Sequence, residues 1–112
     1  MQSFTDEQLN AWRANARAYT AVLLRPGPHR GDNNAASIIW EHGRRNMELH
    51  ADGRLAIVCP VTDTGDLSGI GIFNLDRDAT RAVMEGDPAV QAGVLVYDVY
   101  EVRGIPGDAL PG

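Results

Sequence analysis

Apolar and polar positions along this chain follow two different periods, and each change of period marks the boundary of an expected element. A capping box, Thr5 with Gln8, precedes apolar positions at helical spacing. It predicts a short N-terminal helix from about Asp6 to Asn15, within residues 5–16.

Four runs rich in β-branched and aromatic residues predict strands. The first ends at Arg25-Pro26, where proline denies the ladder a donor. The second and third are joined by the polar stretch 62–66, which is typical of a hairpin connection. The four expected strands cover residues 19–24, 55–59, 69–75 and 94–102.

Two further segments have helical periodicity. The first follows the cap-forming Asn33-Asn34 and is expected to end at Gly53. Its apparent stripe consists of Ala36, Trp40, Gly43 and Met47. The second is expected to begin after Asp76 as N-cap and to end at Gly86 in a left-handed conformation.

The resulting order is strand, helix, strand, strand, helix, strand. This order predicts an α+β fold, a ferredoxin-like βαββαβ unit with a four-stranded antiparallel sheet. The core is expected over residues 18–103, with the extra helix before it and a C-terminal tail over 104–112. At 112 residues, the chain is expected to form a single domain, 1–112.

Two helices cover only one face of a four-stranded sheet, yet three of the expected strands are apolar on both faces. The second face must also be shielded from water, and a second copy of the chain is the simplest cover. We therefore expect a homodimer whose two sheets meet face to face and create the recess in which a ligand binds.

Composition narrows the possible functions. All ten basic residues are arginines, which excludes Schiff-base and P-loop lysine chemistry. A formal charge of −5 without a basic stripe disfavours nucleic acid as a partner, and no apolar run approaches a membrane span. With no recognisable signal peptide and one cysteine, the protein is expected to be soluble and cytoplasmic.

His42 and Asp87 are the catalytic candidates. His42 lies three and four residues after Ile39 and Ile38, at the edge of the helix's buried face. An imidazole there can exchange a proton near neutral pH, and a carboxylate such as Asp87 would orient it. The alternative is that His42 is a core-edge residue and Asp87 only caps the turn opened by Pro88.

Four other residues are candidates for substrate binding. Arg25 can bind an anionic group at a strand end, or be solvated there. Cys59 can contact a ligand, or be a packed thiol in an apolar run. Trp40 and Tyr97 can stack an aromatic ligand, or belong to the core.

The remaining histidines and arginines have simpler interpretations. His29 is expected in a loop and His50 at a helix C-terminus, so the three histidines predict no metal site. Arg44 and Arg45 are expected on the exposed side of the helix, as surface charge.

The chain resembles the YCII-related domain family over roughly residues 18–103. The most specific segment is Asp87-Pro88-Ala89-Val90-Gln91-Ala92-Gly93; the others are His42 to Gly53 with Leu55, Cys59-Pro60, and Gly69 to Phe73. The resemblance implies a dimeric ferredoxin-like fold, or dimeric α+β barrel, a His-Asp pair in a cleft, and lyase activity on a chlorinated hydroxyquinone. The chain departs from the family in its N-terminal helix and in Cys59-Pro60, where relatives often have Gly-Pro.

The leading hypothesis is a cofactor-independent lyase or isomerase in which His42 moves a proton on a hydroxylated aromatic or enolisable small molecule while Asp87 holds the imidazole. The alternative is a non-catalytic metabolite-binding or accessory module of a larger pathway. Haem handling, as in other dimeric α+β barrels, would require an imidazole that faces a large pocket.

Overall fold

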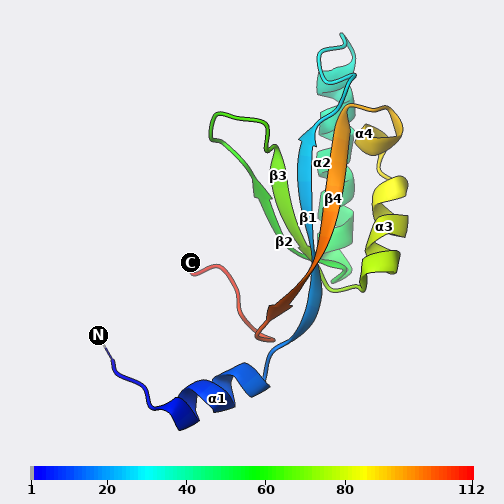
Figure 1. Cartoon of the computed structure of the whole chain (residues 1–112). Helices are drawn as coiled ribbons and strands as arrows, with labels where there is room; N and C mark the ends of the chain where they lie inside the picture. The colour runs from blue at the N-terminus through cyan, green and yellow to red at the C-terminus, as the bar shows by residue number, and fades with distance from the viewer. Residues whose placement is uncertain (1) are drawn as a thin grey trace.

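The computed structural model describes residues 2–112. The strands and the three expected helices occur in the predicted order, and a fourth, short helix follows where only a turn was expected (Figure 1). They are α1 (Asp6–Ala14), β1 (Arg17–Pro26), α2 (Ala35–Ala51), β2 (Leu55–Pro60), β3 (Gly69–Phe73), α3 (Arg77–Glu85), α4 (Pro88–Gln91) and β4 (Leu95–Gly104).

The four strands form one antiparallel sheet in the order β2-β3-β1-β4. Both βαβ connections cross over a neighbouring strand, which is the ferredoxin-like arrangement. Helices α2 and α3 cover the same face of this sheet, as Figure 1 shows. The fold class predicted from the sequence is confirmed.

The core lies between the sheet and the helices. Side chains of alternate residues on each strand point toward the helices, because successive residues of a strand face opposite sides. Those on β1 and β4 are Val22, Leu24 and Leu95, and they pack with Leu49 of α2 and Met84 of α3. The helices are thereby fixed over the sheet, which sets the direction of every side chain on their inner faces.

The inner face of α2 differs from the stripe that the sequence suggested. Trp40 and Met47 are 71% and 74% exposed, whereas Ala35, His42 and Leu49 are buried. The helix is rotated because Ile38, Ile39 and Leu49 together bury more apolar surface than the other stripe. The expected placement of Trp40 in the core is therefore wrong.

Gly86 does not end α3 in a left-handed conformation. Its φ is −86°, so the prediction of a left-handed glycine after α3 is wrong. The left-handed glycine follows α2: this helix ends at Ala51, and Gly53, two residues later, has a φ of +83°. A different constraint acts at Gly86: a Cβ there would lie 2.9 Å from the Nη2 atom of Arg45. Glycine at this position makes room for that guanidinium.

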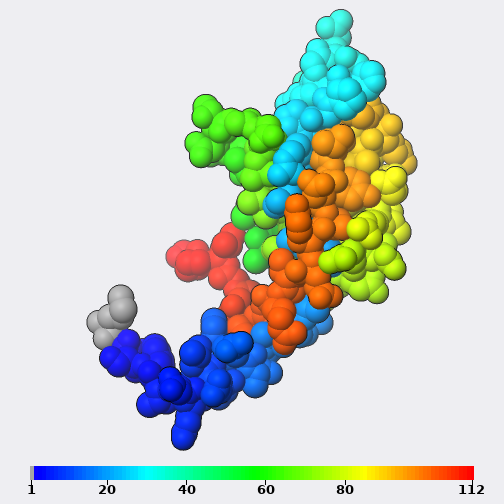
Figure 2. All heavy atoms as spheres, in the orientation of Figure 1, coloured from blue at the N-terminus to red at the C-terminus, as the bar shows by residue number. Residues whose placement is uncertain are grey.

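β1 and β4 are each ten residues long and continue past the other two strands as a two-stranded arm. The first pairs of this arm join Arg17 to Gly104 and Ala18 to Arg103. The arm ends in α1, which buries none of its residues and lies apart from the sheet (Figures 1 and 2). The molecule is consequently elongated, with extents of 56 × 29 × 24 Å.

The sheet face opposite the helices is largely apolar. By register, it carries Leu23 with Ile70, and Ala21 with Ile72 and Tyr100. Tyr100 is 50% exposed and Ile70 is 36% exposed. No helix of the described chain covers this face, as the patterning predicted.

Candidate functional site

His42 and Asp87, 45 residues apart in sequence, are in direct contact. The Nδ1 atom of His42 lies 2.6 Å from the Oδ2 atom of Asp87. His42 comes from the inner face of α2, and Asp87 is the N-cap of α4. Their side chains are 11% and 1% exposed, so the pair is almost fully withdrawn from water.

The local sequence explains the position of Asp87. Pro88 occupies the first position of α4, where its missing N–H costs nothing. The Oδ1 atom of Asp87 accepts a hydrogen bond of 2.8 Å from the backbone N–H of Ala89. Capping therefore uses one carboxylate oxygen and the contact with His42 uses the other, so Asp87 does more than cap the turn.

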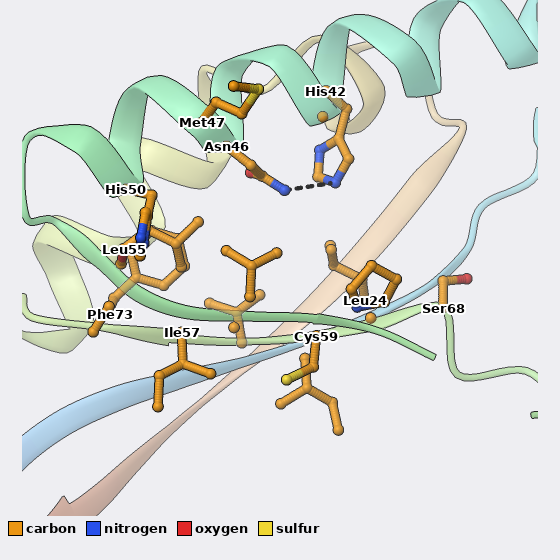
Figure 3. Close-up of a pocket in the computed structure, with 18 of the residues that line it drawn as sticks. Leu24, His42, Asn46, Met47, His50, Leu55, Ile57, Cys59, Ser68 and Phe73 are labelled. Atoms are coloured by element: carbon orange, nitrogen blue, oxygen red, sulfur yellow. Dashed lines mark hydrogen bonds between the residues drawn. The ribbon is translucent and has the colours of Figure 1, made fainter. Parts of the chain in front are cut away.

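The hydrogen bonds indicate which imidazole nitrogen carries the proton. An ionised carboxylate only accepts, so Nδ1 of His42 is the donor to Asp87. In the neutral ring Nε2 then has a free lone pair, and it accepts from the Nδ2 atom of Asn46 at 3.3 Å (Figure 3). Asn46 was not predicted from the sequence; its spacing of four residues from His42 on one helix face was the available signal.

Asp87 is held in its charged form despite its burial. Burial acts to raise the pKa of Asp87, but the hydrogen bond and charge of His42 oppose it. The Ala89 N–H and the charge of Arg45 act in the same direction, and the net pKa lies below its ordinary value. Asp87 thus acts as an acceptor for His42 across the neutral pH range.

A cavity of about 840 Å³ borders this pair. One wall comes from α2 and consists of the buried His42, the half-buried Asn46 and the more exposed Met47 and His50. The opposite wall is apolar and includes Leu55 and Phe73 (Figure 3). Gly69 and Gly71 of β3 also line it, and a Cβ at Gly71 would lie only 3.3 Å from the Cδ1 atom of Leu55. The cavity continues around β2 to residues 108–110 of the tail.

The position of this cavity corrects one expectation. The recess was expected at the face of the sheet left without helices, enclosed by a second subunit. His42 instead lies on the helix-covered side, because Ile38, Ile39 and Leu49 direct this face of α2 into the core. A single chain therefore forms the wall that carries the imidazole.

Of the four residues considered for substrate binding, only Cys59 lines this cavity in the described chain. Its side chain is a partly buried free thiol that points away from α2 in Figure 3. Arg25 pairs with Asp98 on the helix-free face, and Trp40 lies on the outer surface of α2. The structure does not bring Arg25, Trp40 or Tyr97 to the cavity.

Tyr97 belongs to a separate contact between β4 and α3. Its hydroxyl donates to the Oε2 atom of Glu85 at 2.7 Å. Burial, followed by this hydrogen bond and the charge of Glu85, raises the pKa of Tyr97 to about 12. The phenol therefore stays protonated at neutral pH and is no base.

Arg45 and His50 have more specific positions than the sequence suggested. Arg45 is 25% exposed and its Nη2 atom donates to the carbonyl of Val83 at 2.7 Å, so the prediction of surface charge is wrong for this residue. Arg44 does lie at the surface, paired with Glu41. His50 donates from Nδ1 to the carbonyl of Leu55.

Neither a metal-ligand cluster nor a membrane-spanning helix occurs within residues 2–112. No three His, Cys, Asp or Glu side chains in this range cluster as metal ligands would. None of the described helices is both long and apolar enough to cross a membrane.

Comparisons with known proteins bear on the fold. No family model and no curated protein matches this chain. Among solved structures, the chain is similar to 5-chloro-2-hydroxyhydroquinone dehydrochlorinase (TftG) from Burkholderia phenoliruptrix AC1100, in complex with 2,5-dihydroxybenzoquinone. The TM-score is 0.50 at 16% identity, over 72% of this chain and 90% of the other. This likeness supports the ferredoxin-like fold.

Proposed function

We propose that this protein is a cofactor-independent small-molecule enzyme of lyase or isomerase type. His42 transfers a proton on a hydroxylated aromatic or otherwise enolisable substrate, and Asp87 orients the imidazole and stabilises its cation. The observation that carries the proposal is the 2.6 Å contact between the two side chains at the wall of a cavity.

The cavity fits this chemistry. Nε2 of His42, with Nδ1 bound to Asp87, is the nitrogen available to a ligand, and a base must lie within hydrogen-bond reach of the proton that it removes. The apolar walls strengthen the electrostatic interaction between an imidazolium and Asp87 by excluding water. The amide of Asn46 lies beside Nε2 and can donate a hydrogen bond to an oxygen of a ligand bound there.

The proposed proton transfer needs no added reagent. Nε2 of His42 takes a proton from the substrate, and the electron pair left behind forms a new double bond or expels a leaving group with its bonding electrons. In an isomerisation the imidazolium returns the proton to another atom of the substrate. In an elimination the leaving group departs as an anion, and the imidazolium then releases the proton to solvent, which restores neutral His42. General acid–base catalysis of this kind contributes about 10²–10⁴-fold to a rate.

The similarity to a dehydrochlorinase supplies the first compounds to test. We expect 2,5-dihydroxybenzoquinone to bind and raise the melting temperature, and 5-chloro-2-hydroxyhydroquinone to lose HCl. His42→Gln should lower turnover by about 10²–10⁴-fold, while His29→Gln, which changes an exposed loop histidine, should not. Full turnover by His42→Gln would contradict the proposal, and ligand binding without conversion would favour a metabolite-binding module.

We also propose that two copies pair through the helix-free face, as a dimeric α+β barrel of the YCII-related family. The apolar residues of that face support pairing, since monomers rarely expose large contiguous apolar patches. The Arg25–Asp98 ion pair on the same face supplies a polar contact that can fix the orientation of a partner. We place the protein in the cytoplasm, where a reducing environment keeps a thiol such as Cys59 free.

A further inference from the structure

Arg45 is fixed beside the His42–Asp87 pair by contacts on several sides. Its Nη2 atom donates to the carbonyl of Val83, near the end of α3. The same atom occupies the space that a Cβ at Gly86 would fill. Its Nη1 atom lies 3.7 Å from the Oδ2 atom of Asp87, the oxygen that also contacts His42.

The Nη1 atom of Arg45 is buried, and within residues 2–112 it has no hydrogen-bond partner. A buried donor without a partner is costly, so packing at Val83 and Gly86 holds it there against that cost. At 3.7 Å its interaction with Asp87 is one of charge, longer than a hydrogen bond.

The charges around the imidazole are few. From α4, the Asp87 carboxylate faces Nδ1, and from α2 the Asn46 amide faces Nε2. Other titratable or charged residues that border the same cavity are Arg30, His50, Cys59 and Asp108. Glu41 and Arg44, on the same helix, are exposed and pair with each other.

We propose that Arg45 is a positioning residue for the proposed His42–Asp87 pair, keeping Asp87 ionised and limiting how strongly that carboxylate stabilises protonated His42. A positive charge beside the carboxylate offsets part of its attraction for an imidazolium. Without Arg45 the attraction of Asp87 for the imidazolium would be stronger, so His42 would be a less available base. The catalytic consequence rests on the proposed function, whereas the effect on His42 does not.

The test is a titration of the His42 ring followed by NMR, with its signal assigned through His42→Gln. In Arg45→Gln we expect the titration midpoint to rise by about one pH unit, a tenfold gain in proton affinity. Arg45→Lys keeps the charge and should restore most of the wild-type midpoint. Arg44→Gln removes the same charge from the adjacent exposed position and should leave the midpoint unchanged.

Gly86→Ala provides a second variant if Arg45→Gln does not fold. Its φ of −86° suits alanine, and the added Cβ would displace the guanidinium while the arginine remains in the chain. The midpoint should shift upward, by less than in Arg45→Gln. Unchanged midpoints in the folded variants would overturn the assignment of Arg45, and would leave the turnover test of His42 unaffected.

Discussion

At the scale of the residue, the candidate site depends on how Asp87 divides its two oxygens. Oδ1 caps α4 and Oδ2 contacts His42, so the carboxylate is fixed by backbone and side chain together. This double use explains why an aspartate suits the position better than serine, which also caps helices but has only one oxygen. The fixed carboxylate of Asp87 also fixes the orientation of the His42 ring, whose Nε2 atom accepts from Asn46.

The lowered pKa of Asp87 predicts that the free energy of unfolding depends on pH. Because the pKa of Asp87 is lowered in the folded state, its ionisation stabilises the fold above the unfolded-state pKa of about 3.9 and ceases to do so as pH falls through the folded value. Asp87→Asn keeps an oxygen for the Ala89 N–H but loses the charge. It should lower the free energy of unfolding at pH 7 by about 3 kcal/mol, and by less at pH 3, which lies below the unfolded-state pKa.

Urea unfolding at the two pH values measures this difference. Asp76→Asn is the matched control, since Asp76 also caps a helix through a side-chain oxygen, 2.8 Å from the N–H of Ala79, but has no histidine partner. Asparagine caps about as well as aspartate, so the control should change stability little at either pH. An equal loss in Asp87→Asn at pH 7 and pH 3 would show that charge at Asp87 does not stabilise the fold.

At the scale of the element, periodicity predicted the order of strands and helices because each element buries one face. Periodicity did not predict the rotation of α2, since its sequence offers two apolar stripes and only packing on the sheet selects the one with Leu49. The ends of β1 were also missed, because Arg17 and Ala18 become strand residues by pairing with the end of β4. These long-range pairs leave no local signal.

In the candidate site, too, the residues with a local sequence signal were predicted and those defined by long-range contacts were not. Asp87-Pro88 is a local capping signal and His42 follows the inner face of α2, so both were identified from the sequence. Asn46 and Arg45 take their roles from contacts with His42, Val83 and Asp87 that only the tertiary structure creates. A side chain whose role depends on a distant partner resembles ordinary helix surface in the sequence.

The isolated position of α1 predicts that this helix contributes little to the stability of its own chain. None of its residues is buried, although Leu9 and Trp12 are 48% and 58% exposed rather than fully solvated. Deleting residues 2–15 should change the free energy of unfolding by no more than about 0.5 kcal/mol. Leu49→Ala, which empties a core position, should cost about 2–5 kcal/mol in the same urea titration. A loss of several kcal/mol on deletion would mean that α1 is covered.

At the scale of the whole molecule, the two faces of the sheet differ in what covers them. The covered face holds the core, His42 and the cavity wall, whereas the bare face presents apolar side chains with one ion pair among them. Pairing of two bare faces would leave both His42 residues on the outer layers of the assembly. Each protomer would then keep its own cavity wall. Pairing could reach the cavity only through β2 and the tail, whose residues also line it.

The proposed dimer predicts that light scattering at micromolar concentration gives twice the 12.1 kDa mass of the chain. Tyr100→Glu introduces a charge at a half-exposed position of the bare face, opposite Ala21, and should shift the protein toward monomer. Trp40→Glu makes the same kind of change on the outer surface of α2 and should not. Stable interfaces bury about 1,200–2,000 Å², so one buried charge near their centre is disruptive. A monomer mass for the unaltered chain, or a dimer unaffected by Tyr100→Glu, would exclude pairing through this face and leave its apolar side chains facing water.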